Sequence, residues 1–240
     1  MTAPGDPAAP LMPLLSLRSV SKIYGQQLSA VRALDNINLD IEAGEFISIT
    51  GPSGSGKSTV MSILGCLESP SAGEYRIEGI PVQELPPDTL AVLRNARFGF
   101  VFQTFNLLAR TSAVENVALP LVYAGVGAGE RRRRARAALA AVGLADRCDA
   151  RPNQLSGGEQ QRVAIARAII NNPEIILADE PTGNLDSKRG AEIMQIITDL
   201  NHTSGITILM VTHDPAWAAY APRQVVFRDG HIVDDKGRSS

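Results

Sequence analysis

The chain has little cysteine, no long apolar run and no excess of charge, and each shortage excludes a class of protein. Its 240 residues include two cysteines, Cys66 and Cys148, which are too few for a disulfide framework and lack metal-site spacing. A reducing, cytosolic compartment is therefore expected. No stretch reaches the roughly 18 consecutive apolar residues of a membrane helix. The N-terminus lacks the basic and apolar segments of a secretory signal.

The charges are nearly balanced, because 23 lysines and arginines face 25 aspartates and glutamates, for a net charge of −2. This balance excludes a generally basic nucleic-acid coat and an acidic tail as the main character of the chain. Hydrophobic residues make up 44% of the sequence, which is enough to bury a core. At about 150 residues per domain, the length predicts one domain with a smaller attached lobe.

Composition divides the chain into three parts. Residues 1–13 hold four prolines among small residues and predict a flexible tail. Residues 14–234 are expected to form the folded domain, and residues 235–240 a C-terminal tail. Within the domain, residues from about 104 to 170 have a helical texture and predict the smaller lobe, with Gly143 as a helix C-terminal cap.

Short apolar strands alternate with helices over the rest of the domain. This order predicts an α/β fold with a parallel sheet whose two faces are covered. Buried strands are expected at 98–102, 175–178 and 206–211, an edge strand at 74–78, and a closing hairpin over 225–233. Helices are expected to begin near Lys57 and to cover 158–170 and 188–202.

A glycine-rich segment, GPSGSGKST at residues 51–59, matches the phosphate-loop pattern G-x-x-x-x-G-K-[ST]. Its glycines allow positive φ, so that backbone N–H groups can point inward at phosphate oxygens. Lys57 is expected to reach the β- and γ-phosphates, and the Ser58 hydroxyl to coordinate Mg²⁺. A solvated Gly/Ser loop is disfavoured, because an apolar strand precedes the segment and a helical pattern follows it. The expected phosphate-binding residues are Gly51, Ser53, Gly54, Ser55, Gly56, Lys57, Ser58 and Thr59.

Two carboxylates end the buried strand predicted at 175–178. Ligands of open α/β sheets sit at the carboxyl ends of strands, so Asp179 can hold the Mg²⁺ that Ser58 also binds. Glu180 can orient and deprotonate a water for attack on the γ-phosphate. Without the phosphate loop, the same pair would only begin a turn.

A second glycine-containing helix start stands at residues 155–162, LSGGEQQR. Ser156 is a good N-cap, and Gly157 and Gly158 leave backbone N–H groups open to an anion. One nucleotide in one phosphate loop does not require this second anion site. A capped helix without further function is the alternative.

The phosphate loop, LSGGEQQR and the downstream ILADE together resemble the ATP-binding cassette (ABC) ATPases over about residues 14–233. The resemblance implies a P-loop NTPase core with a parallel sheet, an antiparallel β subdomain and an inserted α-helical subdomain. It also implies that ATP and Mg²⁺ are the cofactors and that two copies of the chain form a head-to-tail dimer. Each ATP would then contact the phosphate loop of one copy and Ser156, Gly157 and Gly158 of the other.

The same resemblance implies roles for four further residues. Tyr24 is similar to the aromatic residue that stacks on adenine, and Gln103 to the glutamine that senses Mg²⁺ and the attacking water. Asp186 is similar to a residue of the dimer contact, and His213 to the switch histidine that contacts the γ-phosphate. The expected catalytic residues are thus Glu180, His213 and Gln103, and the expected metal ligands are Ser58, Gln103 and Asp179. Core packing for Tyr24 and a structural role for His213 are the alternatives.

Position 159 departs from the family pattern, because it is glutamate where the family often has glutamine. A carboxylate that pointed at bound phosphate would be electrostatically unfavourable. Glu159 is therefore expected to point away from the phosphate.

Three shorter segments, at 63–67, 100–108 and 120–125, resemble the macrolide-export and lipoprotein-release group of ABC ATPases. The resemblance implies a transmembrane permease as partner, a place on the inner face of the cell membrane, and hydrolysis that drives export or a mechanical stroke. The chain would be either a separate subunit or one domain of a longer polypeptide.

Two rival functions remain at this point. The arginine run at 131–134 would suit a soluble ABC ATPase that acts on nucleic acid or ribosomes, but such a run in an Ala-rich helix is usually a solvated face. No nucleic-acid partner is therefore expected. A P-loop kinase of small molecules would leave LSGGEQQR and His213 without a role.

Overall fold

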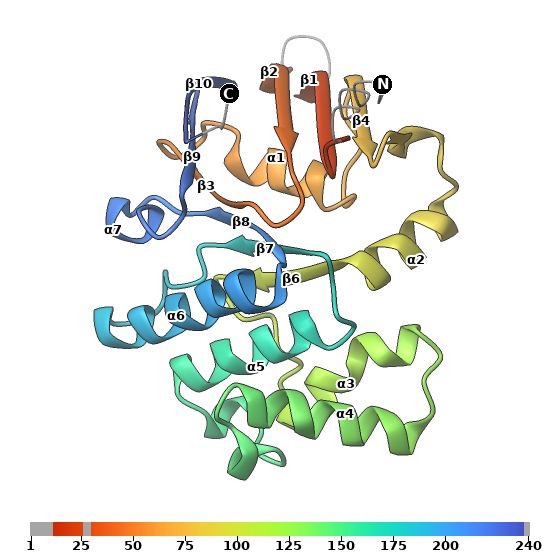
Figure 1. Ribbon diagram of the computed structural model, residues 1–240, viewed down its shortest axis with the longest axis vertical. Coiled ribbons are helices and arrows are strands. Elements are labelled where there is room, and N and C mark those ends of the chain that lie inside the picture. Colours follow the sequence, from red (N-terminus) through yellow and green to blue (C-terminus); the bar gives the residue numbers. More distant parts are fainter. Residues whose placement is uncertain (1–11, 26–29, 238–240) are drawn as a thin grey trace, which may run out of the picture.

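The computed structural model describes residues 12–25 and 30–237, so most of the predicted N-terminal tail and residues 238–240 lie outside the described part. Over these residues the strands form two sheets, a four-stranded sheet in the order β2-β1-β4-β5 and a six-stranded sheet in the order β10-β9-β3-β8-β7-β6. Figure 1 shows the sheets above a lobe of helices. The strands are β1 (Leu15–Tyr24), β2 (Val31–Ile41), β3 (Phe46–Thr50), β4 (Ala72–Ile77), β5 (Ile80–Pro81), β6 (Phe98–Phe102), β7 (Ile175–Asp179), β8 (Thr207–Val211), β9 (Arg223–Arg228) and β10 (His231–Lys236).

Helices cover the six-stranded sheet and build the lobe below it (Figure 1). They are α1 (Lys57–Leu64), α2 (Pro87–Arg97), α3 (Ala113–Tyr123), α4 (Ala128–Ala141), α5 (Gly157–Ile169), α6 (Ser187–Ser204) and α7 (Pro215–Ala218). The predicted α/β fold with a parallel sheet is confirmed, because β6, β7, β8 and β3 pair in parallel, and so do β3 and β9. The predicted closing hairpin is the antiparallel pair β9–β10.

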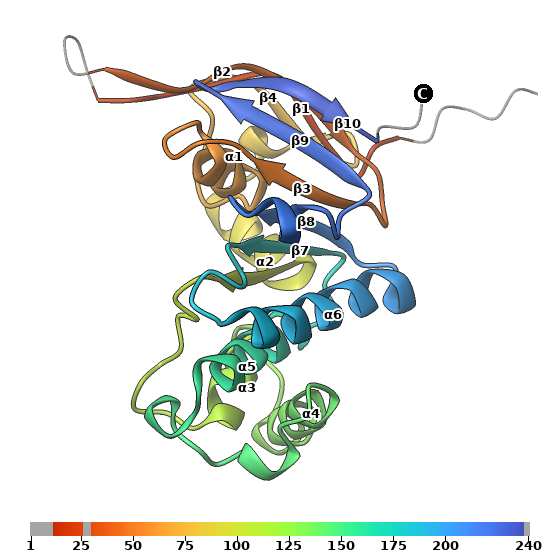
Figure 2. The same cartoon turned by 90° about the vertical axis from the view of Figure 1, so that its left-hand side faces the viewer.

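Both faces of the six-stranded sheet are buried, as the continuous apolar runs predict. Along β7, Ile175 and Leu177 point into a core shared with α1 and the four-stranded sheet. Ile176 and Ala178 point into a second core shared with α3, α4, α5 and α6. Figure 2 shows this layering, with α5 and α6 on one side of the six-stranded sheet and the four-stranded, antiparallel sheet on the other.

The helical lobe is tied to the sheet by that second core rather than by a linker. Leu139 of α4 and Val117 of α3 are fully buried in the same cluster as Ile208 and Met210 of β8. Gly143 has φ 75° and follows α4, as expected of a helix C-terminal cap. The lobe and the sheet therefore share one continuous hydrophobic core.

Three details differ from the sequence-based expectations or extend them. The strand expected at 74–78 as an edge is β4, which lies between β1 and the two-residue β5. Residues 235 and 236, expected to belong to the C-terminal tail, lie in β10, which ends at Lys236. The sequence analysis did not identify α2. None of its residues is fully buried, and only Leu90 and Leu93 pack partly buried against the core.

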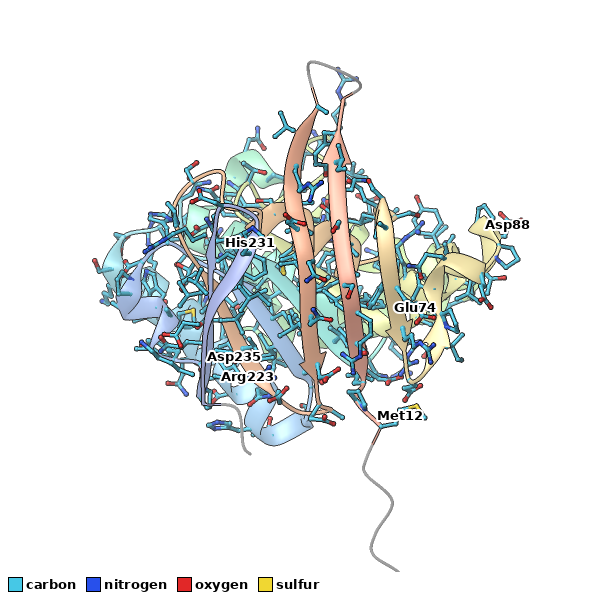
Figure 3. The ribbon with its side chains drawn as sticks, turned by 90° about the horizontal axis from the view of Figure 1, so that it is seen from above. Met12, Glu74, Asp88, Arg223, His231 and Asp235 are labelled. Atoms are coloured by element: carbon cyan, nitrogen blue, oxygen red, sulfur yellow. The ribbon has the colours of Figure 1, made fainter. Side chains whose placement is uncertain are left out.

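Arg223 links β10 to the segment before β3. Its guanidinium is 3% exposed and lies 2.8 Å from an Asp235 carboxylate oxygen and 2.9 Å from a Glu45 oxygen. Figure 3 shows Arg223 and Asp235 side by side on the β9–β10 hairpin. A buried cation with two carboxylate partners holds the last strand against the loop before β3.

Among the described helices, none combines the length and the apolar character that a membrane span requires.

The shared core predicts the effect of a cavity in the lobe. Leu139→Ala removes a fully buried side chain and should lower the free energy of unfolding by about 2–5 kcal/mol. Urea unfolding followed by circular dichroism should still show one transition. Val92→Ala, at a position that is 69% exposed, is the control and should change stability by less than about 0.5 kcal/mol. Two separate transitions for the wild-type protein would contradict a shared core.

Candidate functional site

The candidate site lies where four neighbouring parallel strands end. Register places Ile49 of β3 beside Val211 of β8, and Val211 beside Asp179 of β7. Asp179 in turn lies beside Phe102, the last residue of β6. The segments that follow these strands therefore leave the sheet at one level.

The phosphate loop follows β3 and leads into α1. Its glycines at 51, 54 and 56 have φ values of 142°, 78° and 103°. A Cβ on Gly51 would lie 2.1 Å from the Phe227 carbonyl oxygen, and one on Gly56 would lie 2.6 Å from the Ala33 carbonyl oxygen. Glycine is therefore required at both positions by sterics as well as by φ. The loop is clamped between β9 and β2.

The start of α1 is suited to an anion. No side chain caps its first N–H groups, and its first turn holds no acidic residue. The helix dipole therefore presents its positive end to the loop. Lys57 Nζ donates hydrogen bonds to the carbonyl oxygens of Gly51, at 2.8 Å, and Pro52, at 2.7 Å. These bonds hold the ammonium over the loop.

A cavity of about 370 Å³ opens beside this loop. It brings together residues predicted to bind phosphate, to hold the metal and to catalyse the reaction. The lining residues are Ala33, Ser53, Gly54, Gly56, Lys57, Ser58, Thr59, Gln103, Asp179, Glu180, Val211 and His213. The prediction from sequence that these segments meet is consistent with this cavity. Ala33 is the lining residue on β2 that no sequence pattern indicated.

Asp179, at the end of β7, is in an environment that disfavours its charge. Burial raises the pKa of the Asp179 carboxyl, the nearby Glu180 raises it further, and Lys57 opposes them. A cation beside Asp179 would relieve this destabilisation. Mg²⁺ prefers hard oxygen ligands. Three such ligands are available here: the carboxylate of Asp179, the hydroxyl of Ser58 and the amide oxygen of Gln103. The side chains present therefore fit the implied metal.

Few protein side chains at this site are available as metal ligands. Among the described residues no cluster of three or more His, Cys, Asp or Glu side chains could hold a metal by itself. Mg²⁺ in nucleotide sites uses one or two protein ligands together with waters and phosphate oxygens. The arrangement suits a metal that arrives with its nucleotide.

Glu180 and His213 form a hydrogen-bonded pair across the ends of β7 and β8. The Glu180 Oε1 lies 2.8 Å from His213 Nδ1. Glu180 has φ 47°, and its backbone N–H donates to the Val211 carbonyl oxygen at 3.0 Å. The hydrogen bond to the Glu180 carboxylate, reinforced by the charge of that group, raises the pKa of His213. The contact fixes the orientation of the two side chains relative to each other.

The segment LSGGEQQR at residues 155–162, called the signature segment below, does not line the cavity of its own chain. Ser156 caps α5, its Oγ accepting a hydrogen bond from the Glu159 N–H at 3.4 Å. The Glu159 carboxylate accepts a hydrogen bond from the Ser156 N–H at 2.8 Å, which completes a capping box. This bond lowers the pKa of Glu159. Glu159 therefore folds back on the start of its own helix.

Two predicted site residues have local structural explanations. Tyr24 does not line the cavity; its hydroxyl donates to Glu68 at 2.6 Å, and the residue is 40% exposed. Asp186 caps α6 by accepting a hydrogen bond from the Arg189 N–H at 3.0 Å. Neither contact tests the adenine-stacking and dimer roles, which stay predictions.

Comparison with known proteins shows the family. Residues 34–183 match the ABC transporter family. The chain belongs to the ABC transporter family. The ABC ATPase fold and the enzyme class, that of an ATPase, expected from the resemblance are thereby confirmed.

The similar ABC proteins include several macrolide exporters. The chain is 53% identical over 225 residues to the macrolide export ATP-binding/permease protein MacB of Hyphomonas neptunium. It is 50% identical over 228 residues to MacB of Neisseria gonorrhoeae. Each match covers 94–95% of this chain but 35% of the relative. The predicted resemblance to the macrolide-export group is confirmed, while the chain spans about a third of these relatives' length.

Solved ABC structures match over almost the whole chain. The ATP-binding cassette MJ0796, in a dimeric post-hydrolysis state bound to ADP and Pi, is 46% identical with a TM-score of 0.86. This match covers 94% of the present chain and 100% of MJ0796. CbiO1 of Clostridium perfringens, part of the transporter complex cbiONQ, is 28% identical with a TM-score of 0.81, covering 93% of this chain and 88% of its own.

The Glu180–His213 contact predicts a measurable titration. Glu180→Gln should lower the pKa of His213, because it removes the charge that favours the imidazolium. The pKa is raised in the folded protein, so the contact stabilises the fold below the ordinary histidine pKa. This stabilisation is lost as the pH rises through the raised value. Imidazole NMR titration measures the shift. Glu84→Gln, on an exposed side chain, is the control, and equal effects of the two substitutions would contradict the contact.

Proposed function

We propose that this chain binds Mg²⁺–ATP, hydrolyses it as a dimer and drives a conformational change in a membrane permease. The observation that carries the proposal is the cavity in which Lys57, Asp179, Glu180 and His213 converge from the ends of adjacent strands. A phosphate loop alone would support binding. The Glu180–His213 pair beside it supports hydrolysis as well.

Each side chain has a distinct part in the proposed reaction. Lys57 and the N–H groups of the phosphate loop bind the β- and γ-phosphates. Glu180 accepts the proton of a water whose oxygen bonds to the γ-phosphorus as the bond to the ADP oxygen breaks. His213 donates through Nδ1 to Glu180, which leaves Nε2 to contact the γ-phosphate. The resulting products are ADP and inorganic phosphate.

Ser58, Gln103 and Asp179 would hold the metal in this proposal. Mg²⁺ would supply charge neutralisation on the phosphate oxygens. Asp179 keeps its charge at neutral pH more readily beside a cation, since burial alone disfavours it.

The dimer follows from the position of the signature segment. Ser156, Gly157 and Gly158 begin α5 and do not line the cavity of their own chain. In a head-to-tail pair they would meet the γ-phosphate bound by the other copy, at a helix N-terminus suited to an anion. The similar cassette MJ0796 is dimeric. Asp186 would lie at the same contact and Tyr24 against adenine.

The membrane partner is proposed from the relatives. The MacB proteins are named as ATP-binding/permease proteins, and this chain matches 35% of their length. We infer that the chain acts on the inner face of the cell membrane, with a permease subunit or domain as its partner. Export and a mechanotransmission stroke are the two forms of work that this group implies.

The nucleic-acid alternative has little support from the arginine run. Arg131 donates to the Val126 carbonyl oxygen and Arg134 to the Ile170 carbonyl oxygen. Arg133 pairs with Glu130 at 2.7 Å. These arginines serve contacts within the lobe, so we propose no nucleic-acid partner.

Loss of the phosphate-loop lysine tests nucleotide binding. Lys57→Ala should weaken ATP binding about 10- to 100-fold, because a charge-assisted contact to phosphate is worth about 1.5–3 kcal/mol. Isothermal titration calorimetry measures the affinity. Lys236→Ala, at an exposed lysine paired with Asp234, should leave it unchanged. Equal affinity of wild type and Lys57→Ala would refute the assignment.

Loss of the proposed base tests hydrolysis and dimerisation together. Glu180→Gln should lower the ATPase rate about 10²- to 10⁴-fold and leave ATP uncleaved between two copies. Size-exclusion chromatography should then show a dimer with ATP and a monomer without it. Glu84→Gln should behave as wild type. An unchanged monomer peak with ATP would count against the trapped dimer.

A further inference from the structure

A partly buried arginine on α5, Arg167, forms hydrogen bonds with two backbone carbonyl groups. Arg167 Nη1 donates to the Asn106 carbonyl oxygen at 2.5 Å, and Nη2 donates to the Phe105 carbonyl oxygen at 2.9 Å. Burial lowers the pKa of the guanidinium. Within the described ranges no carboxylate forms an ion pair with it. Backbone carbonyls therefore provide the compensation that a buried cation needs.

The two carbonyls belong to a strained turn. Phe105 has φ 61° and Asn106 has φ 49°, so two consecutive residues other than glycine adopt left-handed backbone. Asparagine tolerates this region, but it is unfavourable for phenylalanine. Such a turn persists only where its surroundings hold it. The Arg167 guanidinium bonds to both residues of the turn.

Gln103 lies two residues before Phe105, the first residue of this turn, and a different segment contacts it on its other side. The Asn184 Nδ2 donates to the Gln103 carbonyl oxygen at 2.8 Å. A Cβ on Gly183 would lie 2.8 Å from Gln103 Nε2, so the loop after β7 packs directly on the glutamine side chain. The place of Gln103 in the cavity is thus set between the β7 loop and the turn at 105–106.

We propose that Arg167 is a positioning residue that acts through Gln103. It lies on α5, whose first residues are the signature glycines. A shift of this helix would move the guanidinium, the turn and then Gln103. In the proposed dimer, the signature segment contacts one nucleotide and Gln103 of the same chain contacts the other. A movement of the signature segment would therefore be transmitted through Arg167 to Gln103. The inference rests on the proposed function for the role of Gln103.

Arg167 is not needed to hold α5 in its place in the fold. Val163, Ile165 and Ala166 of the same helix are fully buried and anchor it in the lobe core. Arg134 offers a matched control, since its guanidinium also donates to a backbone carbonyl, that of Ile170, at 2.7 Å. That contact does not involve the turn at 105–106.

The first test measures the turn directly. Hydrogen exchange of the full chain should be faster for the amides of residues 103–106 in Arg167→Met than in wild type, and unchanged in Arg134→Met. Arg167→Lys keeps the positive charge but cannot bond to both carbonyl oxygens in the same way. Its exchange rates should lie between those of wild type and Arg167→Met. Unchanged exchange in Arg167→Met overturns the proposal, whether or not ATP hydrolysis is observed.

A double-mutant cycle then tests action through Gln103. Arg167→Met should lower kcat about tenfold in the wild-type background, with the ATP dissociation constant unchanged within about twofold. In a Gln103→Ala background the same substitution should lower kcat no further. An equal decrease in both backgrounds would overturn the proposal. Faster exchange in Arg167→Met together with an inactive wild type would instead refute the proposed function and leave the positioning contact standing.

Discussion

The hydrogen-bonded register of four parallel strands is the constraint on which the rest of this molecule depends. β3, β8, β7 and β6 are neighbours in the sheet, and their last residues lie at one level. A shift of one residue in any pair would turn every side chain of that strand to the other face. The phosphate loop, the acidic pair, His213 and Gln103 follow these strands, so one register sets all their positions.

The register is in turn held by two hydrophobic cores. Alternate residues of each central strand enter opposite cores, one shared with α1 and the antiparallel sheet, the other with α5, α6 and the helical lobe. The lobe that carries the signature segment is therefore packed on the same strands that carry the proposed catalytic residues. This packing and the Arg167 contact physically connect the signature segment with the residues proposed to bind and hydrolyse ATP.

Much of the fold and of the site could be predicted from local patterns. The strands at 98–102, 175–178 and 206–211 and the hairpin were found because apolar runs and turn residues are local signals. The helix α2 was missed although local signals were available: Pro87 at its start, Leu90 and Leu93 three residues apart on its core side, and Arg94 and Arg97 in its last turn. The edge position expected of β4 was wrong, because strand order depends on long-range pairing.

By itself the sequence determined which chemistry is available. Roles could be predicted for the glycines at 51 and 56, Lys57, Asp179 and Glu180 because they lie in short motifs at the ends of predicted strands, and for His213 through the family resemblance. Only the tertiary structure decided how these groups are connected. The hydrogen bond between Glu180 and His213 and the hydrogen bonds of Arg167 to residues 105 and 106 join segments that lie far apart in the sequence. Such contacts depend on packing and backbone dihedrals, which no pattern of residue types encodes locally.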